Sequence, residues 1–97
     1  MSETLNIQQL KEKIIPLLKK EGVIRSALFG SYARGEETPA SDIDILVELP
    51  DDRSLLDLVS LQFSLEDALN KKVDLLTFNS IHPLLKSYIK KEQIPLL

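Results

Sequence analysis

Two aspartates interrupt the most β-branched segment of the chain, SDIDILVEL. Ile43, Ile45 and Val47 alternate with Asp42 and Asp44, which is typical of a strand. Residues two apart on a strand point to the same side, with α-carbons about 6.6 Å apart. Unpaired carboxylates this close repel each other and are costly near a core. A divalent cation would remove both problems, and hard oxygen ligands suit Mg²⁺ or Mn²⁺.

A third aspartate, Asp74, lies in another strand-like segment, KVDLL. If the two strands pair, its carboxylate can complete a triad with Asp42 and Asp44. Such a triad can hold two metal ions about 3.5–4 Å apart, which clamp the attacking and leaving oxygens of an in-line displacement. We therefore assign Asp42, Asp44 and Asp74 as candidate catalytic and metal-binding residues. The plainer alternative is that the first two face solvent and that Asp74 pairs with Lys71 or Lys72.

A Gly-Ser pair, Gly30 and Ser31, follows an apolar run, where a strand would turn into a short helix. Glycine lets the backbone approach a phosphate closely, and the N–H groups of a helix N-terminus bind anions. The Ser31 hydroxyl can donate a further hydrogen bond, and Arg34 can reach a phosphate oxygen or departing pyrophosphate. The stretch therefore predicts a triphosphate site beside the metal site. Alternatively, Gly30 and Ser31 form an ordinary turn, and Arg34 pairs with Glu36 or Glu37.

A small sheet with helices must position these residues. Apolar spacing predicts an order of helix, strand, short helix, strand, helix, strand, helix. This order predicts an α/β (α+β) fold, with a small mixed sheet flanked by helices in a single domain over residues 1–97. The elements fall at about residues 6–21, 23–30, 31–35, 42–49, 54–70 and 71–78, with the last helix beginning after Asn79 or Ser80.

Local signals refine the helices. Pro16 should kink or break the first helix. Asn79 or Ser80 should cap the last helix, and His82 is expected near a helix start rather than in a mechanism. Residues 94–97 should form a short extended tail.

The longest helix should bury one apolar stripe, made of Leu55, Leu58, Val59, Leu65 and Leu69. Leu56 and Phe63 lie off this stripe. They could form a partner-facing patch, although a second layer of core is the plainer interpretation.

The composition limits the class of protein. With 97 residues, 43% of them hydrophobic, the chain can build one modest core. A net charge of −3, from 12 basic and 15 acidic residues, argues against nucleic-acid binding. No cysteine and one histidine argue against disulfides and zinc. The sequence shows neither a signal-peptide pattern nor an apolar run of the ~20 residues that cross a bilayer, so we expect a cytoplasmic protein without membrane contact.

The stretch GSYARGEETPASDID resembles the nucleotidyltransferase signature G-S-x-x-x-G followed by D-x-D, as in the DNA polymerase β superfamily. It is most similar to the minimal nucleotidyltransferases, and the similarity spans about residues 7–89. The continuation KVDLLT places the family's third carboxylate on Asp74. The matching residues are Phe29, Gly30, Ser31, Arg34, Gly35, Ser41, Asp42, Ile43 and Asp44.

This resemblance implies a polymerase β-like core, two Mg²⁺ ions and ATP as the substrate that donates AMP. It adds Ser41 to Gly30, Ser31 and Arg34 as nucleotide-binding residues, although the Ser41 hydroxyl alone would be expected to bond local backbone. Many relatives carry a basic residue where this chain has Tyr32, which leaves phosphate affinity more dependent on Arg34.

Many minimal members resemble antitoxins encoded beside a HEPN-domain ribonuclease toxin, and they transfer AMP to a tyrosine of that toxin. The resemblance therefore implies a HEPN-domain toxin as partner. Larger members add a helical domain that grips base and acceptor. Because this chain is too short for one, we expect a hetero-oligomer or a homodimer. Asp74 is the candidate general base.

Two other functions remain open at this point. The domain could neutralise a toxin by covering its surface, with nucleotide incidental. It could instead transfer a nucleotide to an RNA 3′ end or a small molecule such as an antibiotic. The acidic balance weighs against long RNA, and antibiotic-modifying enzymes usually need a second domain.

Overall fold

The structure, a computed structural model, describes residues 6–35 and 42–97. Helices and strands alternate along most of the chain, in the predicted order. Over these two ranges, no helix combines the length and apolar character needed to cross a membrane. The elements are α1 (Ile7–Lys20), β1 (Arg25–Phe29), α2 (Ser31–Arg34), β2 (Ile43–Glu48), α3 (Leu55–Leu69), β3 (Val73–Thr77), a 3₁₀ turn (Phe78–Ser80), α4 (Pro83–Glu92) and β4 (Ile94–Pro95).

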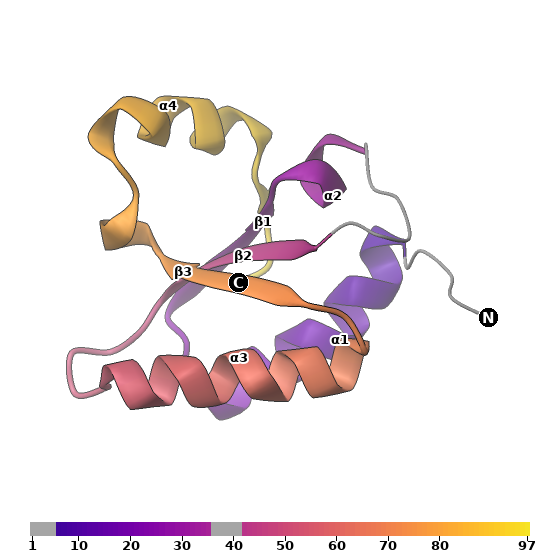
Figure 1. The fold of residues 1–97 in the computed structure, drawn as a ribbon, viewed down its shortest axis with the longest axis vertical. Coiled ribbons are helices and arrows are strands. Elements are labelled where there is room, and N and C mark those ends of the chain that lie inside the picture. Colours follow the sequence, from indigo (N-terminus) through magenta and orange to yellow (C-terminus); the bar gives the residue numbers. More distant parts are fainter. Residues whose placement is uncertain (1–5, 36–41) are drawn as a thin grey trace.

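The four strands form one mixed sheet in the order β3-β2-β1-β4. Strand β1 runs antiparallel to β2 and β4, and β2 runs parallel to β3. Helices α1 and α3 lie on one side of the sheet, and α2 and α4 lie on the other (Figure 1). The predicted fold class is therefore confirmed. The expected extended tail contributes more than predicted, because its residues 94–95 pair with β1 as a fourth strand.

The main core lies between the sheet and the pair α1 and α3. Alternation along β2 buries Ile43, Ile45 and Val47 against this pair. Because side chains alternate across a strand, Asp44 points to the other side of the sheet, toward α2 and α4. The helices contribute one stripe each to the core: Leu10, Ile14 and Leu18 from α1, and Leu61, Leu65 and Leu69 from α3.

Helix α3 corrects part of the predicted stripe. Leu55, in the first turn of α3, is 73% exposed. Val59 is 38% exposed, since it lies one residue, or about 100°, from the stripe through Leu58 and Leu61. Leu56 and Phe63 are exposed at 79% and 63%, so they are not a second layer of core in this chain.

The break predicted at Pro16 and the predicted cap of the last helix are both wrong, whereas a kink at Pro16 stays a prediction. Pro16 does not break α1. It is exposed, so the carbonyl that loses its helical partner can face water. Neither Asn79 nor Ser80 caps the last helix, because both lie in the 3₁₀ turn. Helix α4 begins later, where the ring Nδ1 of His82 accepts a hydrogen bond from the Leu84 N–H at 3.2 Å.

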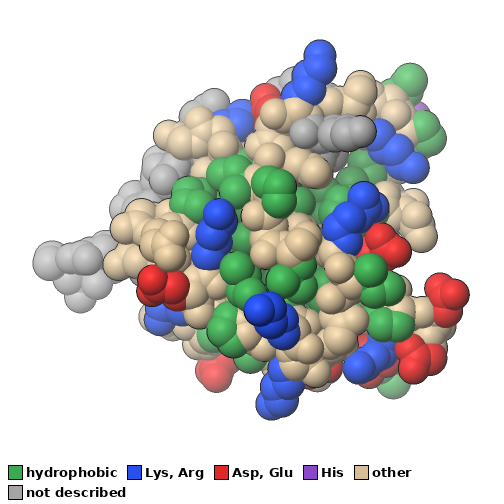
Figure 2. Space-filling view, turned by 180° about the vertical axis from the view of Figure 1, so that it is seen from behind, with side chains coloured by type: hydrophobic (Ala, Val, Ile, Leu, Met, Phe, Trp, Pro, Cys, Tyr) green, Lys and Arg blue, Asp and Glu red, His purple; other side chains and the backbone are tan. Residues whose placement is uncertain are grey.

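Seen from behind, the described lysines and arginines are spread singly among apolar and acidic side chains (Figure 2). A protein that tracks a nucleic-acid backbone usually gathers such charges in one stripe. On the face that Figure 2 shows, the described residues present no such stripe.

Candidate functional site

The sheet register brings two of the three candidate carboxylates together. Asp44 on β2 lies directly opposite Asp74 on β3 in the parallel pair, where neighbouring strands are about 4.8 Å apart. On its other side, Asp44 lies opposite Phe29, the last residue of β1. Asp44 therefore stands at the centre of this end of the sheet. Asp74 is on the edge strand and is exposed.

Burial and the neighbouring carboxylates raise the pKa of Asp44 from 3.8 to about 6. Burial is the largest cause, followed by the negative charge of Asp74 and a hydrogen bond with its carboxyl group. Asp42 adds to the repulsion, whereas the positive charge of Arg34 opposes it. Asp42, Asp74 and Arg34 therefore all lie close enough to Asp44 for their charges to act on it.

Gly30 closes the site from the β1 side. Its backbone has φ +75° and ψ −153°, a conformation open essentially only to glycine. A Cβ atom at Gly30 would overlap the carboxylate of Asp44. Glycine is therefore required at this position for two reasons: the backbone angles and the close approach of the Asp44 side chain.

Helix α2 is a single turn that carries Ser31 and Arg34 directly after Gly30. Gly35 ends it in the left-handed conformation, with φ +74°. The Arg34 Nη1 lies 3.5 Å from the Oε2 of Glu92 near the end of α4. Sequence reasoning missed Glu92, because no local pattern indicates a contact between segments this far apart. The alternative pairs with Glu36 or Glu37 involve positions outside the described residues.

Two further positions of the sequence signature are Tyr32, which the structure describes, and Ser41, which it does not. Tyr32, where many relatives are basic, is buried in the core. Ser41 lies outside the described residues, so its role in nucleotide binding stays a prediction.

The donor set fits a hard divalent cation. Asp44 and Asp74 offer carboxylate oxygens side by side, and burial together with the negative charge of Asp74 raises the pKa of Asp44 despite the nearby positive charge of Arg34. Asp42, directly before β2, adds a third carboxylate nearby. Within residues 6–35 and 42–97, however, no three such groups are assembled at metal-binding distances. The structure thus brings Asp44 and Asp74 together, and the full triad stays a prediction.

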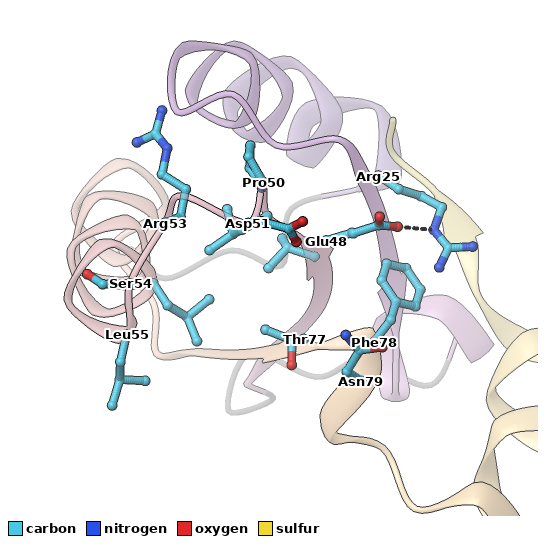
Figure 3. Close-up of a pocket in the computed structure, with 13 residues that line it drawn as sticks. Arg25, Glu48, Pro50, Asp51, Arg53, Ser54, Leu55, Thr77, Phe78 and Asn79 are labelled. Carbon is cyan, nitrogen blue, oxygen red and sulfur yellow. Dashed lines mark ion pairs between the residues drawn. The ribbon is translucent and has the colours of Figure 1, made fainter.

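A cavity of about 510 Å³ lies at the opposite end of the sheet (Figure 3). Arg25 there pairs with Glu48 at 3.3 Å, and its guanidinium lies 4.1 Å from the centre of the Phe78 ring. Arg53, at the rim, pairs with Glu21. Its lining includes none of Gly30, Asp44 and Asp74, so this cavity is separate from the carboxylate end of the sheet.

Comparison with known proteins agrees with this geometry. The profile of the nucleotidyltransferase domain family matches residues 8–96. A candidate protein adenylyltransferase of Methanocaldococcus jannaschii is 57% identical over 93 residues, which cover 96% of this chain and 100% of the relative.

Two solved structures extend the similarity to three dimensions. A minimal nucleotidyltransferase superposes with a TM-score of 0.83 at 33% identity, over 96% of this chain and 98% of the other. An MNT antitoxin in complex with a tri-AMPylated HEPN toxin of Shewanella oneidensis gives a TM-score of 0.72 at 29% identity, over 93% and 71% of the two chains. Because the family profile spans nearly the whole chain and the first relative matches it over its full length, the chain is an enzyme of the nucleotidyltransferase domain family.

Proposed function

We propose that the protein transfers AMP from ATP to a tyrosine of a HEPN-domain toxin, with Mg²⁺ as cofactor, and that this modification silences the toxin. The observation that carries the proposal is the corner where Gly30 packs against the carboxylate of Asp44, with Asp74 beside it. The antitoxin relative bound to a tri-AMPylated toxin supports both the donor group and the class of acceptor.

The reaction exchanges one oxygen on the α-phosphorus of ATP for another. The tyrosine oxygen forms a bond to the α-phosphorus, the bond from that phosphorus to the oxygen bridging the β-phosphate breaks, and pyrophosphate leaves. Asp74 is our candidate to accept the tyrosine proton, because it is exposed at the edge of the sheet, where a protein acceptor can reach it. Bound at Asp42, Asp44 and Asp74, Mg²⁺ would neutralise the charge that develops on the phosphate oxygens.

Three neighbouring residues would hold the rest of the triphosphate. Gly30 brings the backbone close to Asp44, and Ser31 offers its hydroxyl. Arg34 carries a permanent positive charge beside the carboxylates, where it can bind the β- and γ-phosphates and stabilise departing pyrophosphate. We include Ser41 in this group as a prediction.

The test is the mass of the partner after reaction. The protein, its cognate HEPN-domain partner, ATP and Mg²⁺ are incubated, and intact mass spectrometry should show the partner heavier by whole AMP units. Chelation of the metal by EDTA should prevent the change, and so should replacement of the acceptor tyrosine by phenylalanine. GTP in place of ATP tests the choice of nucleotide.

Matched variants assign the roles. Asp42→Asn and Asp44→Asn keep the size of the side chain but remove the charge, and each should abolish transfer. Asp52→Asn changes an exposed carboxylate in the turn after β2 and should leave transfer intact. Full transfer by both Asp42→Asn and Asp44→Asn would refute the assigned site.

A second candidate function is neutralisation by binding alone. The observation in its favour is the exposure of Leu56 and Phe63, which lie seven residues apart and therefore on the same side of α3. If binding suffices, a chain with all three aspartates changed to asparagine should still protect cells from the partner toxin. Loss of protection in that variant, with the complex still formed, would show that neutralisation needs the transfer reaction.

A further inference from the structure

We propose that Glu92 is a positioning residue that holds the Arg34 guanidinium in place for the triphosphate. This inference rests on the proposed function, because it concerns the phosphate-binding arginine of that same site. The carrying observation is the 3.5 Å ion pair between Arg34 on α2 and Glu92 on α4.

The pair is partly shielded from water. The Arg34 and Glu92 side chains are 35% and 29% exposed, so water screens them less than it screens a fully exposed pair. The backbone N–H of Arg34 donates a 3.1 Å hydrogen bond to the carbonyl of Gly30, the residue that lies against the Asp44 carboxylate. Arg34 is thus connected both to Glu92 on α4 and to the corner where ATP would react.

The sheet fixes both ends of this ion pair. Glu92 lies two residues before Ile94, which pairs with Leu28 on β1. Beyond it, the Leu96 N–H donates a hydrogen bond of 2.9 Å to the Ser26 carbonyl. Strand β1 itself continues into α2 and Arg34. Because both partners extend from the same pair of strands, the sheet sets the separation of their backbones.

The chemistry of a guanidinium allows both contacts at once. Arginine has five N–H donors, so the Nη1 that faces Glu92 leaves other donors for phosphate oxygens. Glu92 cannot bind a phosphate itself, since carboxylate and phosphate repel each other. It therefore acts only through Arg34, by reducing the freedom that this long side chain would lose when ATP binds.

Glu92→Gln tests the proposal by nucleotide affinity. We expect the KM for ATP in AMP transfer, and the Kd for ATP with Mg²⁺ measured by calorimetry, to rise about two- to five-fold. Glu92→Asp should restore part of the affinity. The matched control is Glu48→Gln, which breaks the 3.3 Å pair with Arg25 at the other end of the sheet and should leave both constants unchanged.

A double-mutant cycle separates positioning from a merely structural role. Arg34→Ala should weaken ATP binding about tenfold or more, as expected for lost charge-assisted bonds to phosphate. In that background, Glu92→Gln should cause no further loss. Wild-type affinity in Glu92→Gln, tighter binding, or an equal loss in the Arg34→Ala background would each overturn the inference. If the wild-type protein transfers no AMP, the proposed function fails, whereas calorimetry still decides the role of Glu92.

Discussion

Gly30 has backbone angles that only glycine adopts readily, and it lies against the Asp44 carboxylate. Its replacement should therefore affect both stability and activity. Gly30→Ala forces a Cβ atom onto the Asp44 carboxylate and strains the backbone. We expect a loss of about 1–3 kcal/mol in the free energy of unfolding, measured with urea. AMP transfer should also fall sharply, because the Asp44 carboxylate must leave the position that it holds against Gly30.

Gly35→Ala provides the matched control for this change. Gly35 has nearly the same φ, +74°, but among residues 6–35 and 42–97 a Cβ there would meet no atom within 4 Å. Gly35→Ala should therefore bear only the cost of holding alanine in the left-handed conformation, a loss of about 1 kcal/mol in the free energy of unfolding. It should keep transfer activity. Equal losses of activity in the two variants would contradict the importance of the Asp44 contact.

Asp44 should make the stability of the metal-free protein depend on pH. Its pKa is about 6 in the folded chain and near 3.8 when unfolded, so between these values the folded state holds more protons. The contribution of Asp44 to the free energy of unfolding is therefore most favourable below pH 3.8 and is lost as the pH rises toward 6. Asp44→Asn should raise the melting temperature above pH 6 in EDTA, and this gain should vanish near pH 4.

The control for this profile is Asp52→Asn, at an exposed turn position. It should give the wild-type dependence on pH. If Asp44→Asn melts at or below the wild-type temperature at pH 8, the carboxylates do not repel each other as described.

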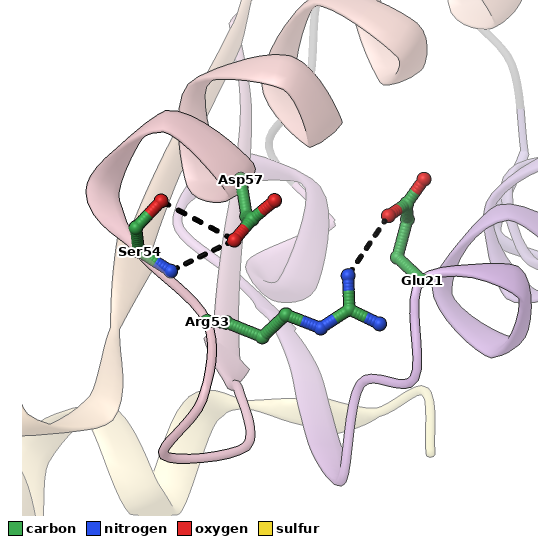
Figure 4. A network of polar contacts seen from close by, with 4 residues as sticks. All are labelled: Glu21, Arg53, Ser54 and Asp57. Carbon is green, nitrogen blue, oxygen red and sulfur yellow. Dashed lines mark hydrogen bonds and ion pairs between the residues drawn. The ribbon is translucent and has the colours of Figure 1, made fainter.

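Among the elements, α3 shows how sequence signals determine a helix start. The Asp57 carboxylate accepts hydrogen bonds from the backbone N–H and hydroxyl of Ser54, at 2.8 and 3.3 Å (Figure 4). Nearby, Arg53 pairs with Glu21 at 3.5 Å and so links this end of α3 to the end of α1. Ser54 is the N-cap of α3, and an acidic residue three positions after a serine is a pattern typical of a helix start.

Asp57→Asn should destabilise the protein at neutral pH. The Ser54 N–H is the main cause that lowers the pKa of Asp57, so the stability from this group is present above pH 3.8 and is lost as the pH falls through the lowered value. The difference in melting temperature between Asp57→Asn and the wild type should therefore shrink in acid. Asp67→Asn, an exposed change on the same helix, should not destabilise the chain at any of these pH values.

The same element shows where sequence reasoning ends. Periodicity predicts that α3 exists and that Leu65 and Leu69 are buried, because a helix must present one face to a core. It does not predict that Leu55 is exposed, since this depends on how far the sheet and α1 extend beneath the first turn. Helix α4 is similar, because His82 rather than an Asn or Ser starts it.

For the whole molecule, the sequence predicts some contacts of the candidate site and does not predict others. Spacing predicts that Asp44 and Asp74 meet, because both lie in strands that could be neighbours, and the register confirms this. Spacing does not predict Glu92 or the pairing of β4 with β1. These contacts join distant segments, and only tertiary packing decides them.

The C-terminal segment should accordingly contribute to global stability as well as to the site. Leu96 is 7% exposed and belongs to the main core, and its N–H bonds the Ser26 carbonyl. We expect Leu96→Ala to lower the free energy of unfolding in urea by about 2–3 kcal/mol, since it leaves a cavity beneath β1.

The comparison is with Leu84→Ala, which removes the same atoms from a side chain that is 82% exposed on α4. That change should stay within about 0.5 kcal/mol of the wild type. If Leu96→Ala is equally mild, β4 is not held to the core, and Glu92 would lose the anchor that places it beside Arg34. A large loss in the free energy of unfolding, confined to Leu96→Ala, would show that the core anchors the segment after β4, next to the strand that positions Glu92.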